Sequence, residues 1–211
     1  MQHSIINYIY SLYEIKQDKK YNIITSGDEY LNYNDKYCNY VPTSYILLHK
    51  MIKSYPFHSN DHLIDFGCGK GRVVCISAIH GCRKITGIEC DDGIFQILYR
   101  NVHSLYQREN INLVHDVIEN FDIPDDSNRF FFFYPFHIKL FINIMNRIRV
   151  SLQKKYRDNI LFLAGPPSFY LDYINKQSDL KLIEHIKEHP IHPTNKSMDM
   201  EKQELYVYQF I

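Results

Sequence analysis

Three glycines at alternate positions, with an acidic residue before them, are the part of the sequence best suited to bind a ligand. The run Asp65-Phe66-Gly67-Cys68-Gly69-Lys70-Gly71 follows one apolar segment and precedes another. This order predicts a buried strand, a tight turn and the start of a helix. Glycine lets a ligand approach the backbone closely, and a helix N-terminus offers unpaired N–H groups with a partial positive charge. The pattern therefore indicates a site for a nucleotide-like ligand.

The positions of the glycines narrow the choice of nucleotide. The dinucleotide fingerprint G-x-G-x-x-G would need its third glycine at position 72, which is Arg72. The Gly-Lys-Ser/Thr ending of a phosphate-binding loop does not follow here either. The carboxylate of Asp65 would repel a pyrophosphate, whereas it suits a ligand with an amino group or a positively charged sulfur. An NAD-dependent oxidoreductase is therefore the less favoured alternative.

Two further acidic residues close the next two predicted strands. Glu89 ends the segment 84–89, eighteen residues beyond Gly71, and an acid about 20 residues after such a loop is placed to bind a ribose diol. Asp116 stands near the end of the segment 111–117. Ligands in open α/β sheets bind at the carboxyl ends of the strands. We therefore expect Asp65, Glu89 and Asp116 to lie around one ligand.

The run from Asp65 to Gly71 resembles the glycine-rich loop of class I S-adenosylmethionine-dependent methyltransferases. The resemblance is nearest to a group of poorly characterised bacterial members, in which the run Tyr40-Val41-Pro42-Thr43-Ser44-Tyr45 precedes the first strand. It implies S-adenosyl-L-methionine as the cofactor and S-adenosyl-L-homocysteine as the product. Asp65 would bind the amino group of the methionine moiety, Glu89 the ribose, and Asp116 the adenine. The implied cofactor-binding residues are Tyr40, Thr43, Asp65, Gly67, Cys68, Gly69, Gly71, Arg72, Glu89, Cys90, Asp116, Val117, Tyr134 and Pro135.

The run Tyr134-Pro135-Phe136 occupies the position that faces the reacting methyl group in the resembled family. Amine methylases of nucleic acids carry Asn/Asp-Pro-Pro-Tyr/Phe there, and the bacterial group carries Asn-Pro-Phe more commonly, so this chain departs from both patterns. The departure weakens an assignment to base amino groups. Pro135 predicts an extended conformation for Tyr134.

The resemblance implies methyl transfer to an unidentified nitrogen or oxygen acceptor, on a small molecule or a protein side chain. A neutral amine needs only a lone pair aimed at the methyl group, whereas a hydroxyl or an ammonium needs a base. The candidate catalytic residues are Tyr134, His137 and Tyr45. A non-catalytic S-adenosylmethionine-binding module is the alternative outside enzymes.

Alternating strands and helices from residue 61 onward position these residues. The predicted strands are 62–66, 84–89, 111–117, 130–133, 160–164, 180–185 and 204–210, and the predicted helices are 72–80, 93–107 and 138–155. Four consecutive phenylalanines, 130–133, suit a central parallel strand that is covered on both faces. The sequence therefore predicts an α/β fold with a seven-stranded, doubly wound, mostly parallel sheet over residues 61–211, whose last strand is antiparallel.

Residues 1–60 differ in composition from the rest of the chain and are expected to form a helical and aromatic cap. Ten of the eighteen tyrosines lie here. Apolar residues with helical spacing occur over 5–13 and again over 45–52. The second helix is expected to start at Thr43 or Ser44, with Thr43 as its cap. Tyrosine combines an apolar body with a polar tip, which suits a lid over a pocket and suits an ordinary half-buried surface equally well.

The composition limits partners and location. Lys and Arg number 24, and Asp and Glu number 24, which argues against a protein held mainly by nucleic-acid phosphates. No apolar run approaches the roughly 20 residues of a membrane span, and the N-terminus does not have the order of a signal peptide. Five cysteines without a C-x-x-C pair predict reduced thiols in a cytoplasmic protein. No metal is expected; the weighed metal alternatives are Cys75 with Cys82, and His185 with His189 and His192.

Overall fold

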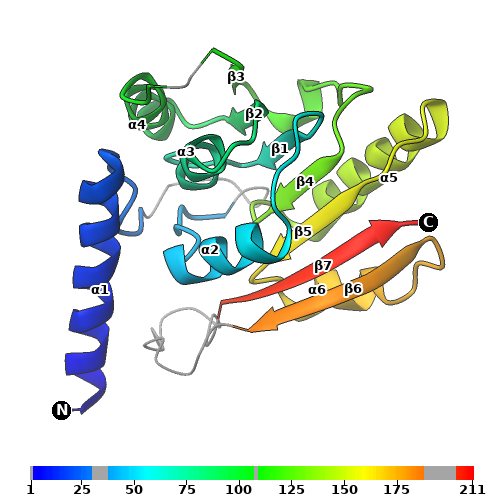
Figure 1. Cartoon of the computed structure of the whole chain (residues 1–211). Coiled ribbons are helices and arrows are strands. Elements are labelled where there is room, and N and C mark those ends of the chain that lie inside the picture. The colour runs from blue at the N-terminus through cyan, green and yellow to red at the C-terminus, as the bar shows by residue number, and fades with distance from the viewer. Residues whose placement is uncertain (1, 30–37, 107–108, 188–202) are drawn as a thin grey trace.

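The structure, a computed structural model, describes residues 2–29, 38–106, 109–187 and 203–211 (Figure 1). In this part of the chain seven strands form one sheet in the order β3-β2-β1-β4-β5-β7-β6. The strands are β1 (His62–Phe66), β2 (Lys84–Glu89), β3 (Ile111–His115), β4 (Arg129–Phe132), β5 (Ile160–Ala164), β6 (Leu180–Lys187) and β7 (Glu204–Phe210). The strands β3, β2, β1, β4 and β5 are parallel to their neighbours, and β7 is antiparallel to both β5 and β6. The predicted fold class is confirmed.

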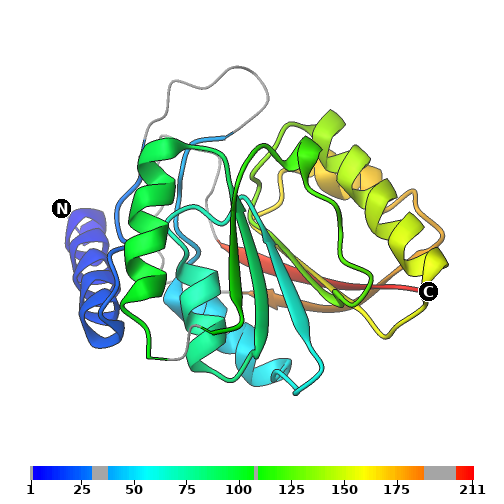
Figure 2. The ribbon, with the colours of Figure 1, turned by 90° about the horizontal axis from the view of Figure 1, so that it is seen from above.

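Helices cover both faces of the sheet, as the view from above shows (Figure 2). The helices are α1 (Gln2–Tyr21), α2 (Tyr45–Ser54), α3 (Arg72–Ile79), α4 (Asp92–His103), α5 (Ile138–Lys154) and α6 (Ser168–Ile174), with one 3-10 turn at Ile118–Asn120. The helices α2, α3 and α4 lie on one side, whereas α5 and α6 lie on the other. The strand order reverses between β1 and β4, so the carboxyl ends of these two strands flank a crevice where ligands bind in such sheets.

The central strand β4 shows how the sequence builds both halves of the core. Phe131 packs with α2 and α3, while Phe130 and Phe132 pack with α5 and α6, because successive side chains of a strand point to opposite faces. All three side chains are at most 1% exposed. The prediction that this strand is central and covered on both faces is confirmed.

The first sixty residues share the core of the sheet. Ile23 and the α2 residues Leu47, Leu48 and Met51 belong to the same hydrophobic cluster as Phe131. On α1 four large apolar side chains are exposed, namely Tyr8, Ile9, Leu12 and Ile15. The N-cap of α2 is Ser44, whose Oγ accepts from the N–H groups of Ile46 and Leu47, so the expectation for Thr43 is wrong.

Element boundaries differ from prediction by a few residues. The third strand ends at His115 and leaves Asp116 in the turn behind it. The helix expected over 93–107 runs from Asp92 to His103, and Gln107 lies outside the described residues. The sequence did not predict α6, because seven residues are too few to establish a helical period.

The weighed metal alternatives gain no support from the described residues. Cys75 and Cys82 are free, buried thiols, and the Cys82 thiol donates to the Lys84 carbonyl over 3.4 Å. His189 and His192 lie outside the described residues. No helix in the described ranges is long and apolar enough to cross a membrane.

Candidate functional site

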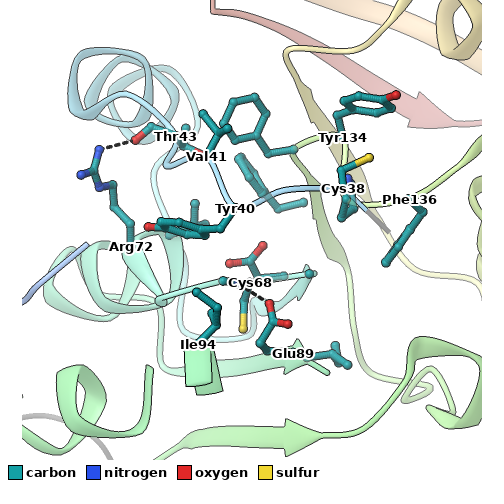
Figure 3. Close-up of a pocket in the computed structure, with 18 of the residues that line it drawn as sticks. Cys38, Tyr40, Val41, Thr43, Cys68, Arg72, Glu89, Ile94, Tyr134 and Phe136 are labelled. Carbon is teal, nitrogen blue, oxygen red and sulfur yellow. Dashed lines mark hydrogen bonds between the residues drawn. The ribbon is translucent and has the colours of Figure 1, made fainter. Parts of the chain in front are cut away.

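A cavity lies at the carboxyl ends of β1, β2 and β4, directly over the glycine bend (Figure 3). Its walls come from segments far apart in the sequence, namely 38–43, 65–69, 88–90 and 131–136, with Arg72, Val73, Ile94, Asp116 and Ile118. The free space between these walls is about 70 Å³.

Two glycines allow the walls to approach this closely. Gly69 has φ +56°, and a Cβ there would lie 2.4 Å from ring carbons of Tyr40. Gly67 has φ +71°, and a Cβ there would lie 2.5 Å from the Cβ of Pro135. Any larger residue would push these walls apart. Gly71 does not line the cavity: it is the N-cap of α3, and its missing side chain makes room for Leu98.

Asp65 is the acidic group at the floor of the cavity. Its side chain comes from the buried strand β1 and is 2% exposed. Its Oδ2 has no hydrogen-bond partner among the described residues. Burial, reinforced by the negative charge of Glu89, raises the pKa of Asp65 to about 8. The carboxyl is therefore largely protonated at pH 7 and would ionise on meeting a cation.

Glu89 stands at the end of β2 and faces the same cavity (Figure 3). Its Oε2 accepts from the N–H of Gly69 at 3.0 Å, and its Oε1 accepts from the N–H groups of Cys90 and Asp91 at 2.8 and 2.9 Å. Burial raises the pKa of this carboxyl, while these backbone N–H groups oppose the rise. Because two carboxylate oxygens offer about four acceptor sites, Glu89 fixes the glycine bend and keeps capacity for a ligand hydroxyl.

Asp116 lies at the outer rim of the cavity, as expected, and its side chain is exposed. Its Oδ1 accepts from the N–H of Val117 at 2.7 Å and from the side-chain amide of Asn120 at 2.9 Å. Cys90 also lines the cavity, whereas Val117 does not. The structure therefore brings Asp65, Glu89 and Asp116 to one cavity.

Tyr134 and its neighbours form the opposite wall. Tyr134 has φ +41°, so the predicted extended conformation is wrong. The chain turns sharply here and thereby brings Pro135 against Gly67; such a backbone costs of the order of 1–3 kcal/mol and is found at functional sites. Burial and the neighbouring Cys38 raise the pKa of Tyr134 to about 12. At neutral pH its phenol is therefore protonated and can donate a hydrogen bond.

The other two candidate catalytic residues lie elsewhere. Tyr45 is fully buried under Arg72, and its hydroxyl donates to Asp18 at 2.5 Å. His137 is exposed at the N-terminal end of α5, with its ring 6.3 Å from that of Phe169. Neither residue lines the cavity.

Arg72 lines the cavity wall, but its guanidinium is directed away from the ligand space (Figure 3). It donates to the Thr43 carbonyl at 2.8 Å and to the Thr25 hydroxyl at 2.8 Å, and it forms an ion pair with Glu14 on α1. Asp18, one turn further along α1, lies 3.6 Å away. Arg72 therefore ties α1 and the 40–43 wall to the first turn behind the glycines.

Tyr40 completes this wall. Its ring covers Gly69, its hydroxyl donates to the Thr25 carbonyl at 2.6 Å, and the Lys70 ammonium lies 4.7 Å from the ring centre. Sequence analysis did not single out Cys38, Val41, Ile94 and Phe133, which also line the cavity. The only sequence signal for the Arg72 cluster was an acid pair, Glu14 and Asp18, spaced for one helix face.

A second, larger cavity of about 700 Å³ adjoins the first. Both share Cys38, Asn39, Val41, Phe133 and Tyr134 in their walls. The remaining walls come from the loop behind β5, the start of α6 and the first residues of β7. Sequence analysis did not predict this cavity, because it depends on the pairing of β7 with β5.

Several solved structures are similar to this chain. An uncharacterized protein from Listeria monocytogenes serotype 4b superposes with a TM-score of 0.57 at 16% identity, over 78% of this chain and 66% of that one, which is just under two thirds. An RNA methyltransferase from Salinibacter ruber in complex with S-adenosyl-L-homocysteine superposes with a TM-score of 0.51 at 16% identity, over 81% of this chain and 94% of that one. A SAM-dependent methyltransferase from Geobacter sulfurreducens, with the same ligand, superposes with a TM-score of 0.56 at 10% identity, over 78% of this chain and 89% of that one. No protein-family model matches the chain, and no curated protein sequence matches it significantly.

Proposed function

The chain has the class I, Rossmann-like fold of S-adenosylmethionine-dependent methyltransferases, and we propose that it is such an enzyme, acting on a nitrogen or oxygen acceptor. The observation that carries the proposal is the buried carboxyl of Asp65, whose unpartnered oxygen belongs to a cavity that also holds Glu89. A buried polar atom without a partner is costly. A ligand ammonium would satisfy it, and the methionine moiety carries one.

Each wall of the cavity has a role in this proposal. S-adenosyl-L-methionine would supply a methyl group on a positively charged sulfur. Asp65 would hold its ammonium, and the backbone of 67–69 would line the methionine moiety. Glu89 would accept from the ribose hydroxyls through charge-assisted hydrogen bonds. Around the adenine we place Cys90, Ile94 and Asp116, and toward the acceptor Tyr134, Pro135 and Phe136.

Because the Tyr40 ring lies directly over Gly69, we propose that the 40–43 wall moves outward when the cofactor binds. Tyr40 would leave Gly69 and give up its hydrogen bond to Thr25. The Arg72 cluster would keep α1 and Thr43 attached to the core during this movement. We accordingly propose that residues 1–60 act as a wall and lid of the site. We also propose a reducing compartment such as the cytoplasm, because none of the five cysteines forms a disulfide.

Two ligands test the cofactor assignment. S-adenosyl-L-homocysteine at 100 times its Kd should stabilise the protein by about 2.7 kcal/mol, measured by thermal unfolding, and NAD at the same concentration should not. A higher unfolding temperature with NAD and not with S-adenosyl-L-homocysteine would contradict the proposal, since it would show that the site binds a pyrophosphate despite the carboxyls of Asp65 and Glu89.

Methyl transfer itself needs a separate experiment. Protein incubated with a methyl-labelled donor and panels of metabolites, proteins and nucleic acids should transfer label to one class. Binding of the donor without transfer to any panel would favour the non-catalytic binding module.

A further inference from the structure

The second cavity is placed to receive the methyl acceptor, because its walls continue those of the cofactor cavity. Tyr134 and Phe133 separate the two spaces and line both. In Figure 3 the Tyr134 ring points away from Glu89, on the side of the Cys38 sulfur. A group bound in the second cavity therefore approaches the cofactor past Tyr134.

Aromatic rings form much of this second wall. The Tyr134 ring centre lies 5.8 Å from that of Phe169 in an edge-on arrangement, and the Tyr206 ring stacks on His185 at 4.0 Å. Pro166 and Pro167 add apolar surface from the loop behind β5. Such walls favour a flat, largely apolar group, because apolar surface gains free energy when it leaves water.

Glu204 carries the charge of the cavity. It is the only lysine, arginine, aspartate or glutamate among the described residues that line this space. Its backbone carbonyl accepts from the N–H of Gly165 at 2.8 Å, which fixes the start of β7 against the loop behind β5. Within the described ranges, both hydrogen bonds to its side chain, from His185 at 2.8 Å and from Tyr206 at 3.2 Å, use Oε2. Its Oε1 is therefore left to meet a ligand.

The sign of this charge decides between nitrogen and oxygen acceptors. When a neutral amine is methylated, its lone pair forms the new C–N bond, the S–C bond breaks with its electron pair on sulfur, and the nitrogen becomes a cation that then releases one proton. An alcohol or phenol must instead lose its proton to react, and it becomes anionic as it does so. Glu204 and the rings stabilise a cation through charge and cation–π attraction, and they disfavour an anion.

We propose that the cavity lined by Tyr134, Phe169, Glu204 and Tyr206 binds the acceptor, and that the acceptor is a small aromatic molecule with a basic nitrogen, which receives the methyl group. This inference rests on the proposed methyltransferase function and names its substrate class. Glu204 binds the ammonium form of the acceptor through Oε1. The ammonium gives up one proton, to Glu204 or to water, before its lone pair forms the new C–N bond, and the methylated nitrogen is again a cation beside the carboxylate. The same carboxylate disfavours a phosphate group inside the cavity.

Three ligands with the same ring system and different charges test whether the second cavity prefers a cation. Tryptamine, 3-ethylindole and indole-3-propionate share an indole and carry a positive, a neutral and a negative side chain. With the protein saturated in S-adenosyl-L-homocysteine, calorimetry should give tryptamine at least tenfold tighter binding than indole-3-propionate, with 3-ethylindole between them. Equal binding, the reverse order, or no tryptamine binding at 5 mM would overturn the inference.

A substitution tests whether Glu204 is the cause of the preference for a cation. Glu204→Gln keeps an oxygen that can accept from His185 and Tyr206, and it removes only the charge. It should weaken tryptamine binding at least fivefold and leave the affinity for S-adenosyl-L-homocysteine unchanged. The matched control Asp172→Asn, an exposed carboxylate on α6, should change neither. An unchanged tryptamine affinity in Glu204→Gln would refute the role of Glu204, whereas failure of S-adenosyl-L-homocysteine to bind the unmodified protein would refute the proposed function instead.

Discussion

Replacement of Asp65 by Asn should make the protein more stable and less able to bind its cofactor. The pKa of Asp65 is raised to about 8 by burial and by Glu89, from the ordinary value of 3.8. Between these two values the folded chain holds a proton that the unfolded chain has released. As the pH rises between these values, this one group therefore lowers the free energy of unfolding of the unmodified protein by about 1.4 kcal/mol per pH unit. The Asn variant loses this dependence.

The difference between the two proteins isolates Asp65. From pH 5 to pH 7 the variant should gain about 2.7 kcal/mol relative to the unmodified protein, two pH units at about 1.4 kcal/mol each. Any fixed cost of an unpartnered amide is the same at both pH values and cancels. Urea unfolding at pH 5, 6 and 7 measures the difference, and the exposed Asp172, changed to Asn, serves as the control.

Cofactor binding should change in the opposite direction. The same Asn variant should bind S-adenosyl-L-homocysteine at least tenfold more weakly, because it cannot ionise beside the ligand ammonium. In the unmodified protein at pH 7, binding should release close to one proton, measured by calorimetry in buffers of different ionisation enthalpy. Parallel pH dependence of stability in the two proteins would refute the reasoning, since it would mean that the folded carboxyl ionises in its ordinary range.

Three further substitutions test other parts of the site. Glu89→Gln keeps an acceptor for the Gly69 N–H but should weaken S-adenosyl-L-homocysteine binding at least tenfold, by calorimetry; unchanged affinity would remove Glu89 from the site. Gly69→Ala adds a Cβ where the methionine moiety would approach the backbone and should weaken S-adenosyl-L-homocysteine binding at least tenfold, whereas Gly81→Ala, also at positive φ but in open space, should cost only stability; equal binding in both would show that the close approach of ligand and backbone does not matter. Arg72→Met leaves the buried Glu14 uncompensated and should lower the free energy of unfolding by about 3–5 kcal/mol in urea; a loss below 1 kcal/mol would contradict the anchoring role.

The sequence by itself determined the sheet, the glycine bend and the acids at the strand ends. These features are local: a continuous apolar run such as 130–133 suits a strand that is covered on both faces, and the glycines between β1 and α3 allow the tight turn that joins them. The carboxyl ends of parallel strands must then meet at one edge of the sheet, so Asp65, Glu89 and Asp116 were brought together as expected.

Only the tertiary structure decided which side chains complete the site. Tyr45 was grouped with the catalytic candidates by proximity in sequence, but packing buries it under Arg72. Arg72 forms its ion pair with Glu14, which lies 58 residues away, and no local sequence pattern predicts that these two side chains come together. Tyr134 adopts a positive φ that its proline neighbour disfavours locally, because the contact between Pro135 and Gly67 outweighs that preference. Glu204 reaches the second cavity only because β7 pairs with β5, and such long-range pairings depend on the whole core rather than on any one segment.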